Sequence, residues 1–120
     1  MYDTKRNKLD KFEIQAAFRT EEIAKRITFF AKKGTPVRLK VDVYLPLAKS
    51  TPTSLTSAPN VRKPDLDNVV KLVLDALNGV AWEDDQQVNC IFAKKLERRR
   101  FGNPHTHIRV EYQKEEESHV

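Results

Sequence analysis

The stretch DLDNVVKLVLDALNG, residues 65–79, decides the fold. Its apolar side chains recur every three or four positions and form one stripe, made of Leu66, Val69, Val70, Val73, Leu74 and Leu77. This period predicts an amphipathic helix from Asp67 to Asn78 that packs its stripe against a core. Asp67 is placed to cap the first turn, and Gly79 is placed to end the helix in a left-handed conformation.

Strands are predicted on both sides of this helix. In residues 37–45, Val and Leu alternate with polar residues, which is typical of a strand with one buried face. Residues 88–96 and 106–112 are predicted as two further strands joined by an irregular hairpin. A first helix over residues 10–31 is predicted from the spacing of Phe12, Ala16, Ile23, Ile27 and Phe30, although residues 12–18 also alternate as a strand would. This order of elements predicts an α+β fold with a small mixed β-sheet and packed helices.

The remaining segments are predicted to be irregular. Residues 46–64 contain four prolines together with Ser and Thr, so they are expected to form a long loop. Residues 1–9 and 113–120 are expected to be mobile ends. Because ~150 residues is the usual length of a domain, the range 1–120 is assigned to a single domain.

Composition excludes several classes of protein. No apolar run approaches the ~18 residues of a membrane span, and the N-terminus has no apolar signal-peptide region. Cys90 is the only cysteine, which excludes a disulfide framework and a cysteine-based zinc site. We therefore expect a cytoplasmic protein that does not span a membrane.

Charge is unevenly distributed along the chain. There are 22 Lys and Arg residues against 17 Asp and Glu residues, for a formal net charge of +5. Basic residues gather in the N-terminal third and at residues 94–100, whereas acidic residues gather at 65–67, 83–85 and 115–117. Residues 94–100 could be a solvated hairpin tip, but together with the basic N-terminal third they favour contact with phosphates.

Two acidic clusters could carry chemistry. Asp65 and Asp67 stand two residues apart before the helix, so their carboxylates can converge while Leu66 turns into the core. A helix cap would explain Asp67 alone, but one cap needs only one side chain, and Asp65 is then unexplained. The cluster Glu83–Asp85 could be a solvated turn, or it could supply a third carboxylate to a metal site. Oxygen ligands without Cys or His suit Mg²⁺ or Mn²⁺.

Three further features admit both a structural and a functional interpretation. Lys71 lies four residues after Asp67, where it could form an ordinary helical ion pair or place an ammonium beside a phosphate. Trp82 could stack on a base, but we expect it to anchor its turn to the core. His105 and His107 could chelate a metal, but ordinary polar residues at a strand entry are favoured because no further zinc ligand lies nearby.

Taken together, these residues resemble the RusA family of Holliday-junction resolvases. The segments that carry the resemblance are KPDLDN at 63–68, Lys71, DALN at 75–78 and WEDDQQV at 82–88. The D-L-D-N-x-x-K helix start followed at this distance by W-x-D-D-x-Q-V is specific, whereas D-x-D alone is not. The predicted strand at 37–45, with Thr35 and Pro36 before it and Pro46 after it, adds to the similarity, which runs over residues 15–112.

The resemblance implies a small homodimeric crossover junction endodeoxyribonuclease, of a kind often encoded by phages and prophages. Such an enzyme would use Mg²⁺, or Mn²⁺ in its place, to resolve four-way DNA junctions by paired symmetric nicks during recombination and repair. By position, the resemblance assigns Asp65, Asp67 and Asp85 as metal ligands and Lys71 as the catalytic lysine, with Asp84 as the alternative third ligand. Residues expected to bind DNA, from the resemblance and from their charge, are Arg62, Lys63, Lys94, Lys95, Arg98, Arg99 and Arg100.

The sequence departs from the family at its start. Family members begin with a strand and a basic, proline-containing segment, and neither is found in this sequence. The chain is therefore expected to be truncated, divergent or degenerate. The loop at 46–64 is also longer than in compact members. One alternative is therefore a catalytically impaired or non-junction-specific DNA-binding protein of phage origin. Another is a small structural or partner-binding protein whose helix is simply capped by Asp67.

Overall fold

The fold is seen in a computed structural model that describes residues 2–3, 10–45, 57–58, 61, 65–96, 98–99 and 104–113. The elements follow in the order β1 (Tyr2–Asp3), α1 (Lys11–Lys25), β2 (Val37–Tyr44), β3 (Ser57–Ala58), α2 (Leu66–Leu77), the 3₁₀ turn η1 (Asp85–Gln87), β4 (Val88–Lys95), β5 (Arg98–Arg99) and β6 (His105–Tyr112). The predicted α+β fold with a small mixed sheet is confirmed. The predicted strands and the second helix agree with the structure to within one residue at each end.

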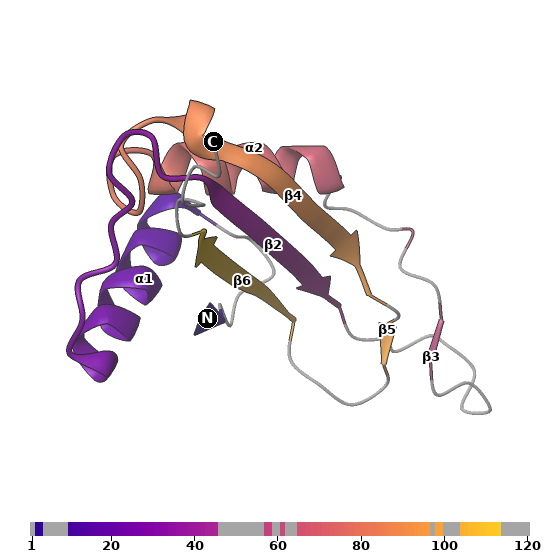
Figure 1. Cartoon of the computed structure of the whole chain (residues 1–120). Helices are drawn as coiled ribbons and strands as arrows, with labels where there is room; N and C mark the ends of the chain where they lie inside the picture. The colour runs from indigo at the N-terminus through magenta and orange to yellow at the C-terminus, as the bar shows by residue number, and fades with distance from the viewer. Residues whose placement is uncertain are drawn as a thin grey trace.

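The main sheet has four strands in the order β1-β6-β2-β4 (Figure 1). β2 is parallel to β4 and antiparallel to β6, which makes the sheet mixed. β3 and β5 pair separately as a two-stranded antiparallel sheet. β4 forms one edge of the main sheet and ends in Lys94 and Lys95, and charged side chains at an edge discourage pairing with another chain.

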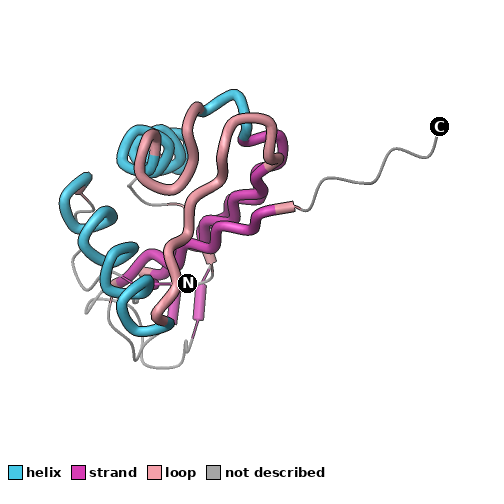
Figure 2. Tube along the Cα trace, turned by 60° about the vertical axis from the view of Figure 1, so that its left-hand side comes forward, coloured by secondary structure: helices cyan, strands magenta, loops and turns pink. Residues whose placement is uncertain are grey.

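The core lies between one face of the sheet and the two helices, which Figure 2 shows on the same side of the strands. Along β2 the alternation predicted from the sequence is observed, because Val37, Leu39, Val41 and Val43 are buried while their neighbours are not. α2 adds the stripe residues Val69, Val73 and Leu77, each buried. The opposite face of β2, β4 and β6 carries no helix (Figure 1).

The first helix is shorter than predicted. α1 begins after Asp10, whose carboxylate accepts a hydrogen bond from the Glu13 N–H at 2.8 Å, and it ends at Lys25. Arg26 then takes a left-handed φ of 54°. The buried Glu22 carboxylate accepts a hydrogen bond from the Phe29 N–H at 2.7 Å, so it holds the chain in a turn where the prediction had continued the helix.

The face that α1 buries also differs from the prediction. Ile14, Phe18 and Glu22 point into the core at four-residue steps. The predicted stripe is instead largely exposed, with Phe12 at 83%, Ile23 at 76%, Ile27 at 56% and Phe30 at 40%. The period was that of a helix, but the spacing of apolar residues did not identify which of two neighbouring stripes meets the sheet.

Two short strands lie within the segments that were predicted to be irregular. β1 pairs antiparallel with β6 through Tyr2↔Ile108 and Asp3↔His107. The predicted loop at 46–64 contains β3, which pairs with β5 in the arginine-rich segment. Residues 1, 4–9, 46–56, 59–60, 62–64, 97, 100–103 and 114–120 lie outside the described ranges. The predicted mobility of the two ends and the predicted loop therefore stay predictions there. In the described ranges, no helix has the length and apolar character to cross a membrane.

Candidate active site

The first part of the candidate site is the start of α2. Asp65 occupies the N-cap position with extended backbone angles, φ −68° and ψ 132°, but its carboxylate makes no capping hydrogen bond. Asp67 lies in the first turn of the helix and not at the cap, so the predicted cap was placed two residues too late. Both carboxylates are exposed. Neither is therefore committed to stabilising the helix end through its side chain.

Lys71 follows Asp67 by one helical turn and is also exposed. Among the residues that the structure describes, no ion pair joins Lys71 to Asp67. The ordinary helical ion pair that the spacing allowed is not observed. The start of α2 thus presents two carboxylates and one ammonium to solvent, and each can interact with a ligand.

The second part is the acidic turn before β4, where each carboxylate has a partner. Glu83 accepts a hydrogen bond from the Lys33 backbone N–H. Asp84 is the N-cap of η1 and accepts from the Gln86 N–H at 3.0 Å. Asp85 is half-buried, and its Oδ1 accepts from the Trp82 indole N–H at 2.8 Å. Both Asp84 and Asp85 thus take part in hydrogen bonds of the turn, and the choice of Asp85 as the third ligand stays a prediction from the resemblance.

Trp82 anchors this turn, as its sequence position suggested. The side chain is fully buried, so it cannot stack on a base without leaving the core. Trp82 forms backbone bridges with both Ala31 and Asn78, which join the turn to the segment after α1 and to the end of α2. Gly79, at φ 76°, adopts the left-handed conformation predicted for it, and its N–H donates to the Trp82 carbonyl at 2.7 Å.

The side-chain amide of Gln87 supports the acidic turn through hydrogen bonds. The sequence pattern did not identify this residue. Its side chain is 8% exposed. The Nε2 group lies at 3.1, 2.7 and 3.1 Å from the carbonyl oxygens of Ala31, Lys32 and Thr35, and the Oε1 atom accepts from the Asp84 N–H at 2.9 Å. One amide thereby ties the acidic turn to a loop more than fifty residues earlier in the chain. Its one signal in the sequence was its place in W-x-D-D-x-Q-V.

Tyr112 closes the same region from β6. Its hydroxyl donates to the Ala81 carbonyl at 3.0 Å. Burial raises the pKa of Tyr112 above its ordinary value, and the negative charge of Glu22 adds to this rise. The neutral phenol is therefore the form that stabilises the fold.

Replacing Tyr112 with phenylalanine should test this contact. Because its pKa is raised in the folded state, its stabilising contribution is complete below the unfolded pKa of ~10 and is lost as the pH rises above it. We expect Tyr112→Phe to lower the free energy of unfolding by about 1 kcal/mol at neutral pH. Urea titrations should show that the loss disappears above about pH 10, since the wild type then weakens while the variant does not. An equal loss at every pH would contradict this role.

The carboxylates suit a hard cation in their chemistry. Asp65 and Asp67 are exposed, and Asp85 has one oxygen outside its bond to Trp82, so the set offers the oxygen ligands that Mg²⁺ prefers. Within the described ranges, no three His, Cys, Asp or Glu side chains lie together in a group that could hold a metal ion. The assignment of all three aspartates to one ion stays a prediction from the resemblance. His105 stacks on Tyr44 with ring centroids 4.4 Å apart, which favours a structural role for it over a chelate.

The residues predicted to bind DNA are only partly described. Lys94 is exposed and Lys95 half-buried at the end of β4. Arg98 and Arg99 form β5, of which the structure describes the backbone alone. Arg62, Lys63 and Arg100 lie outside the described residues.

Comparisons with known proteins bear on the family of the chain. A protein of Bacillus subtilis (strain 168) named "Uncharacterized protein YqaN" is 41% identical over 61 residues, which cover 44% of this chain and 43% of that protein. The match thus spans less than half the length of this curated relative. The family described as Endodeoxyribonuclease RusA matches residues 1–111, nearly the whole chain and including the start of α2 and the acidic turn. The chain therefore belongs to the RusA family of endodeoxyribonucleases.

Proposed function

We propose that this protein is a Mg²⁺-dependent endonuclease that resolves four-way DNA junctions by paired symmetric nicks, in DNA recombination and repair in the cytoplasm. Membership of the RusA family supports the class of reaction. The observation that carries the proposal is the start of α2, where two exposed carboxylates and Lys71 stand within about two helical turns and have no structural partner among the described residues. Charged groups exposed in this way contribute little to the stability of the helix, so they are available to a ligand.

Asp65, Asp67 and Asp85 would hold the metal ion, with Mn²⁺ as a substitute for Mg²⁺. When bound, such an ion polarises phosphoryl oxygens and makes water a stronger nucleophile. An ionised carboxylate contributes acceptor oxygens only, which is what a metal ion requires of its ligands. Asp85 is held in place by the Trp82 indole, so its orientation is set by the core and not by solvent.

Lys71 would neutralise and orient the scissile phosphate. Its ammonium is carried by a helix whose inner face is buried, so the base of the side chain is fixed while its tip reaches solvent. The first backbone N–H groups of α2 lack helical partners and add positive potential at the same end. A pentacovalent phosphate gains negative charge as it forms, and a positive group fixed nearby stabilises that charge.

The protein is proposed to act as a homodimer, because paired nicks need two sites. Exposed apolar side chains at the end of α1 support this, since Ile23 and Ile27 line one shallow pocket there and grouped apolar side chains on a surface are typical of protein–protein contacts. Ile23, at 76% exposure, lies on this surface, and the neighbouring Ala24 is exposed as well.

Replacing Ile23 with glutamate should weaken the dimer. A charge in an apolar interface loses its hydration, and we expect the dissociation constant from sedimentation equilibrium to rise by at least about tenfold. Ala24→Glu adds the same charge without removing a large apolar side chain and should have a smaller effect. A wild type that is monomeric at all concentrations would exclude the homodimer.

The activity itself is tested with a synthetic four-way junction labelled on opposite strands. The wild type should nick both strands symmetrically in Mg²⁺, should also do so in Mn²⁺, and should not nick in EDTA. Salt-sensitive binding without nicking in any of these metals would favour the catalytically impaired DNA-binding protein. Absence of any DNA binding would favour the structural or partner-binding alternative.

A further inference from the structure

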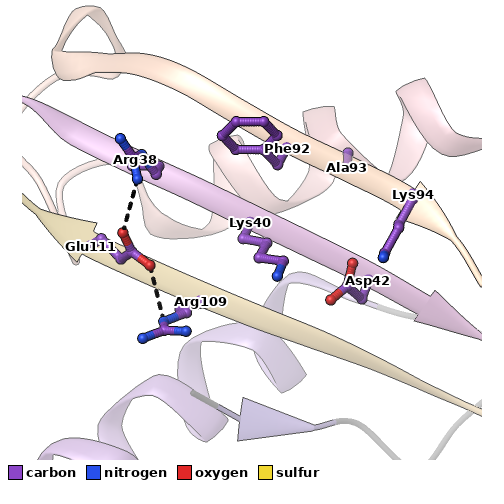
Figure 3. A pocket seen from close by; sticks show the side chains of 8 residues that line it. All are labelled: Arg38, Lys40, Asp42, Phe92, Ala93, Lys94, Arg109 and Glu111. Carbon is purple, nitrogen blue, oxygen red and sulfur yellow. Dashed lines mark ion pairs between the residues drawn. The ribbon is translucent and has the colours of Figure 1, made fainter.

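The face of the main sheet that carries no helix is basic and slightly hollowed. Side chains from β2, β4 and β6 line a shallow cavity of about 430 Å³ on this outer face (Figure 3). Four of the lining residues are cations, namely Arg38, Lys40, Lys94 and Arg109, and two are acids, Asp42 and Glu111. Of these cations, only Lys94 belongs to the set predicted from the sequence to bind DNA.

This face keeps a net positive charge, although two acidic side chains lie on it. Glu111 is shared, since one of its oxygens lies 3.6 Å from Arg38 and the other 3.1 Å from Arg109 (Figure 3). Lys40 and Lys94 have no ion-pair partner among the described residues. Both arginine side chains remain about half exposed despite their pairing. The cations can therefore take up phosphate without first breaking a buried network.

An aromatic side chain stands among these cations. Phe92 projects from the edge strand β4 and is 58% exposed, directly across from Lys40 in the register of β2 and β4. Phenylalanine side chains are usually buried, because the apolar ring is more stable away from water. Cations that follow a sugar–phosphate backbone, interleaved with an aromatic ring that can stack on a base, are typical of surfaces that hold single-stranded nucleic acid.

The charge of this face argues for DNA over a second copy of the chain. If two copies met through it, the net positive excess of each would oppose that of the other. A strand of DNA instead complements it along its length. The strands β2, β4 and β6 each have eight residues, ~26 Å of extended backbone, which is long enough to follow several nucleotides.

We propose that the outer face of β2, β4 and β6 is a DNA-contact surface in its own right, on which the cations hold a sugar–phosphate backbone and Phe92 stacks on a base left unpaired near a branch point. This inference rests on the proposed DNA substrate, but it does not depend on the metal site or on cleavage. It adds Arg38, Lys40, Phe92 and Arg109 to the residues that contact DNA. It also gives the protein a means of distinguishing branched DNA from plain duplex, because a fully paired duplex offers no base to Phe92.

The charge component is tested by fluorescence anisotropy with a labelled four-way junction in EDTA, where no cleavage occurs. Lys40→Glu should weaken binding by about tenfold and reduce the slope of log K against log salt by about one. Asp42→Asn, which removes a negative charge from the same face, should strengthen binding about twofold. Lys11→Glu makes the same charge change on α1, away from this face, and should have clearly less effect than Lys40→Glu.

The stacking component is tested with three labelled DNAs, which are a single strand, a four-way junction and the duplex of one arm. Phe92→Ala should weaken binding of the single strand and the junction by about tenfold and leave duplex binding nearly unchanged. Phe92→Tyr keeps an aromatic face and should restore wild-type binding. Circular dichroism should show that each variant keeps the wild-type fold, since the replaced side chains are exposed or half-exposed.

Several results would overturn the inference. If Lys40→Glu and Lys11→Glu weaken binding equally, the outer face has no special role, and junction binding by the wild type would still support the proposed function. Equal losses on duplex and single strand for Phe92→Ala would exclude stacking. A change in sedimentation for Lys40→Glu would mark this face as a contact between copies of the chain. If the wild type binds none of the three DNAs, both this inference and the proposed function fail.

Discussion

Replacing Asp67 with asparagine is expected to slow junction cleavage by at least about a thousandfold while junction binding stays within about twofold. Asparagine keeps the size of the side chain and removes its charge, so it cannot replace a carboxylate beside a divalent cation. Asp67 is exposed in the first turn of α2 and carries no capping bond, so the helix should not unfold. The loss would then lie in the chemical step. Single-turnover cleavage in Mg²⁺, compared with anisotropy in EDTA, measures the two effects separately.

A matched control is available on the first helix. Glu21→Gln makes the same charge change at a partly exposed ion pair with Lys25, 3.1 Å away, which should contribute little to stability. It should cleave at nearly the wild-type rate. If Asp67→Asn cleaves as fast as Glu21→Gln, Asp67 is not a metal ligand. Equal loss of binding and cleavage in Asp67→Asn would indicate that the carboxylate positions DNA and does not serve the reaction.

Replacing Gln87 with leucine is expected to lower the free energy of unfolding by about 3 kcal/mol. Leucine has a similar volume but no polar atoms, so the carbonyl oxygens around Nε2 and the Asp84 N–H would lose their shared partner in a buried place. An unsatisfied buried polar group costs ~1–3 kcal/mol. Because water can reach some of these groups, the expected loss in the free energy of unfolding is smaller than the total over all the lost hydrogen bonds. Urea unfolding followed by Trp82 fluorescence should report the loss directly, because that ring is buried in the same turn.

The neighbouring glutamine supplies the control for this change. Gln86 is exposed, and only its backbone N–H takes part in the turn, so Gln86→Leu should change stability by less than about 0.5 kcal/mol. Gln87→Glu should be at least as damaging as Gln87→Leu, because a carboxylate would face carbonyl oxygens that need a donor. Comparable stability of Gln87→Leu and Gln86→Leu would show that the amide is not the support of this turn.

Elements with a strong local pattern could be predicted closely. The apolar residues of α2 and of β2 lie on one face at a regular spacing. The same residues are therefore buried whatever element packs against that face. The exposed pair Asp65 and Asp67, with Lys71 one turn later, also follows from local spacing, because a helix fixes where side chains four residues apart lie. These parts of the fold and of the candidate site depend on neighbours in the sequence.

The end of α1 could not be predicted in the same way. Its apolar residues form two overlapping stripes, and the choice between them depends on the shape of the sheet and of α2, against which the helix packs. Glu22 is of a residue type that is rarely buried, yet it is buried and accepts a hydrogen bond from the Phe29 N–H beyond the end of the helix. The pairing of β1 with β6 and of β3 with β5 likewise joins segments far apart in the chain, and two-residue strands leave too little pattern to detect.

The sequence by itself determined the α+β fold, the helix that presents Asp65, Asp67 and Lys71, and the resemblance that the family match confirms. Each of these depends on residue type and short-range period, which the unfolded chain already contains. Only the tertiary structure decided that Gln87 supports the acidic turn, that Trp82 orients Asp85, and that Lys40, Phe92 and Arg109 share one open face. The physical reason is that buried hydrogen bonds and neighbouring strands bring together groups that the chain keeps up to about seventy residues apart.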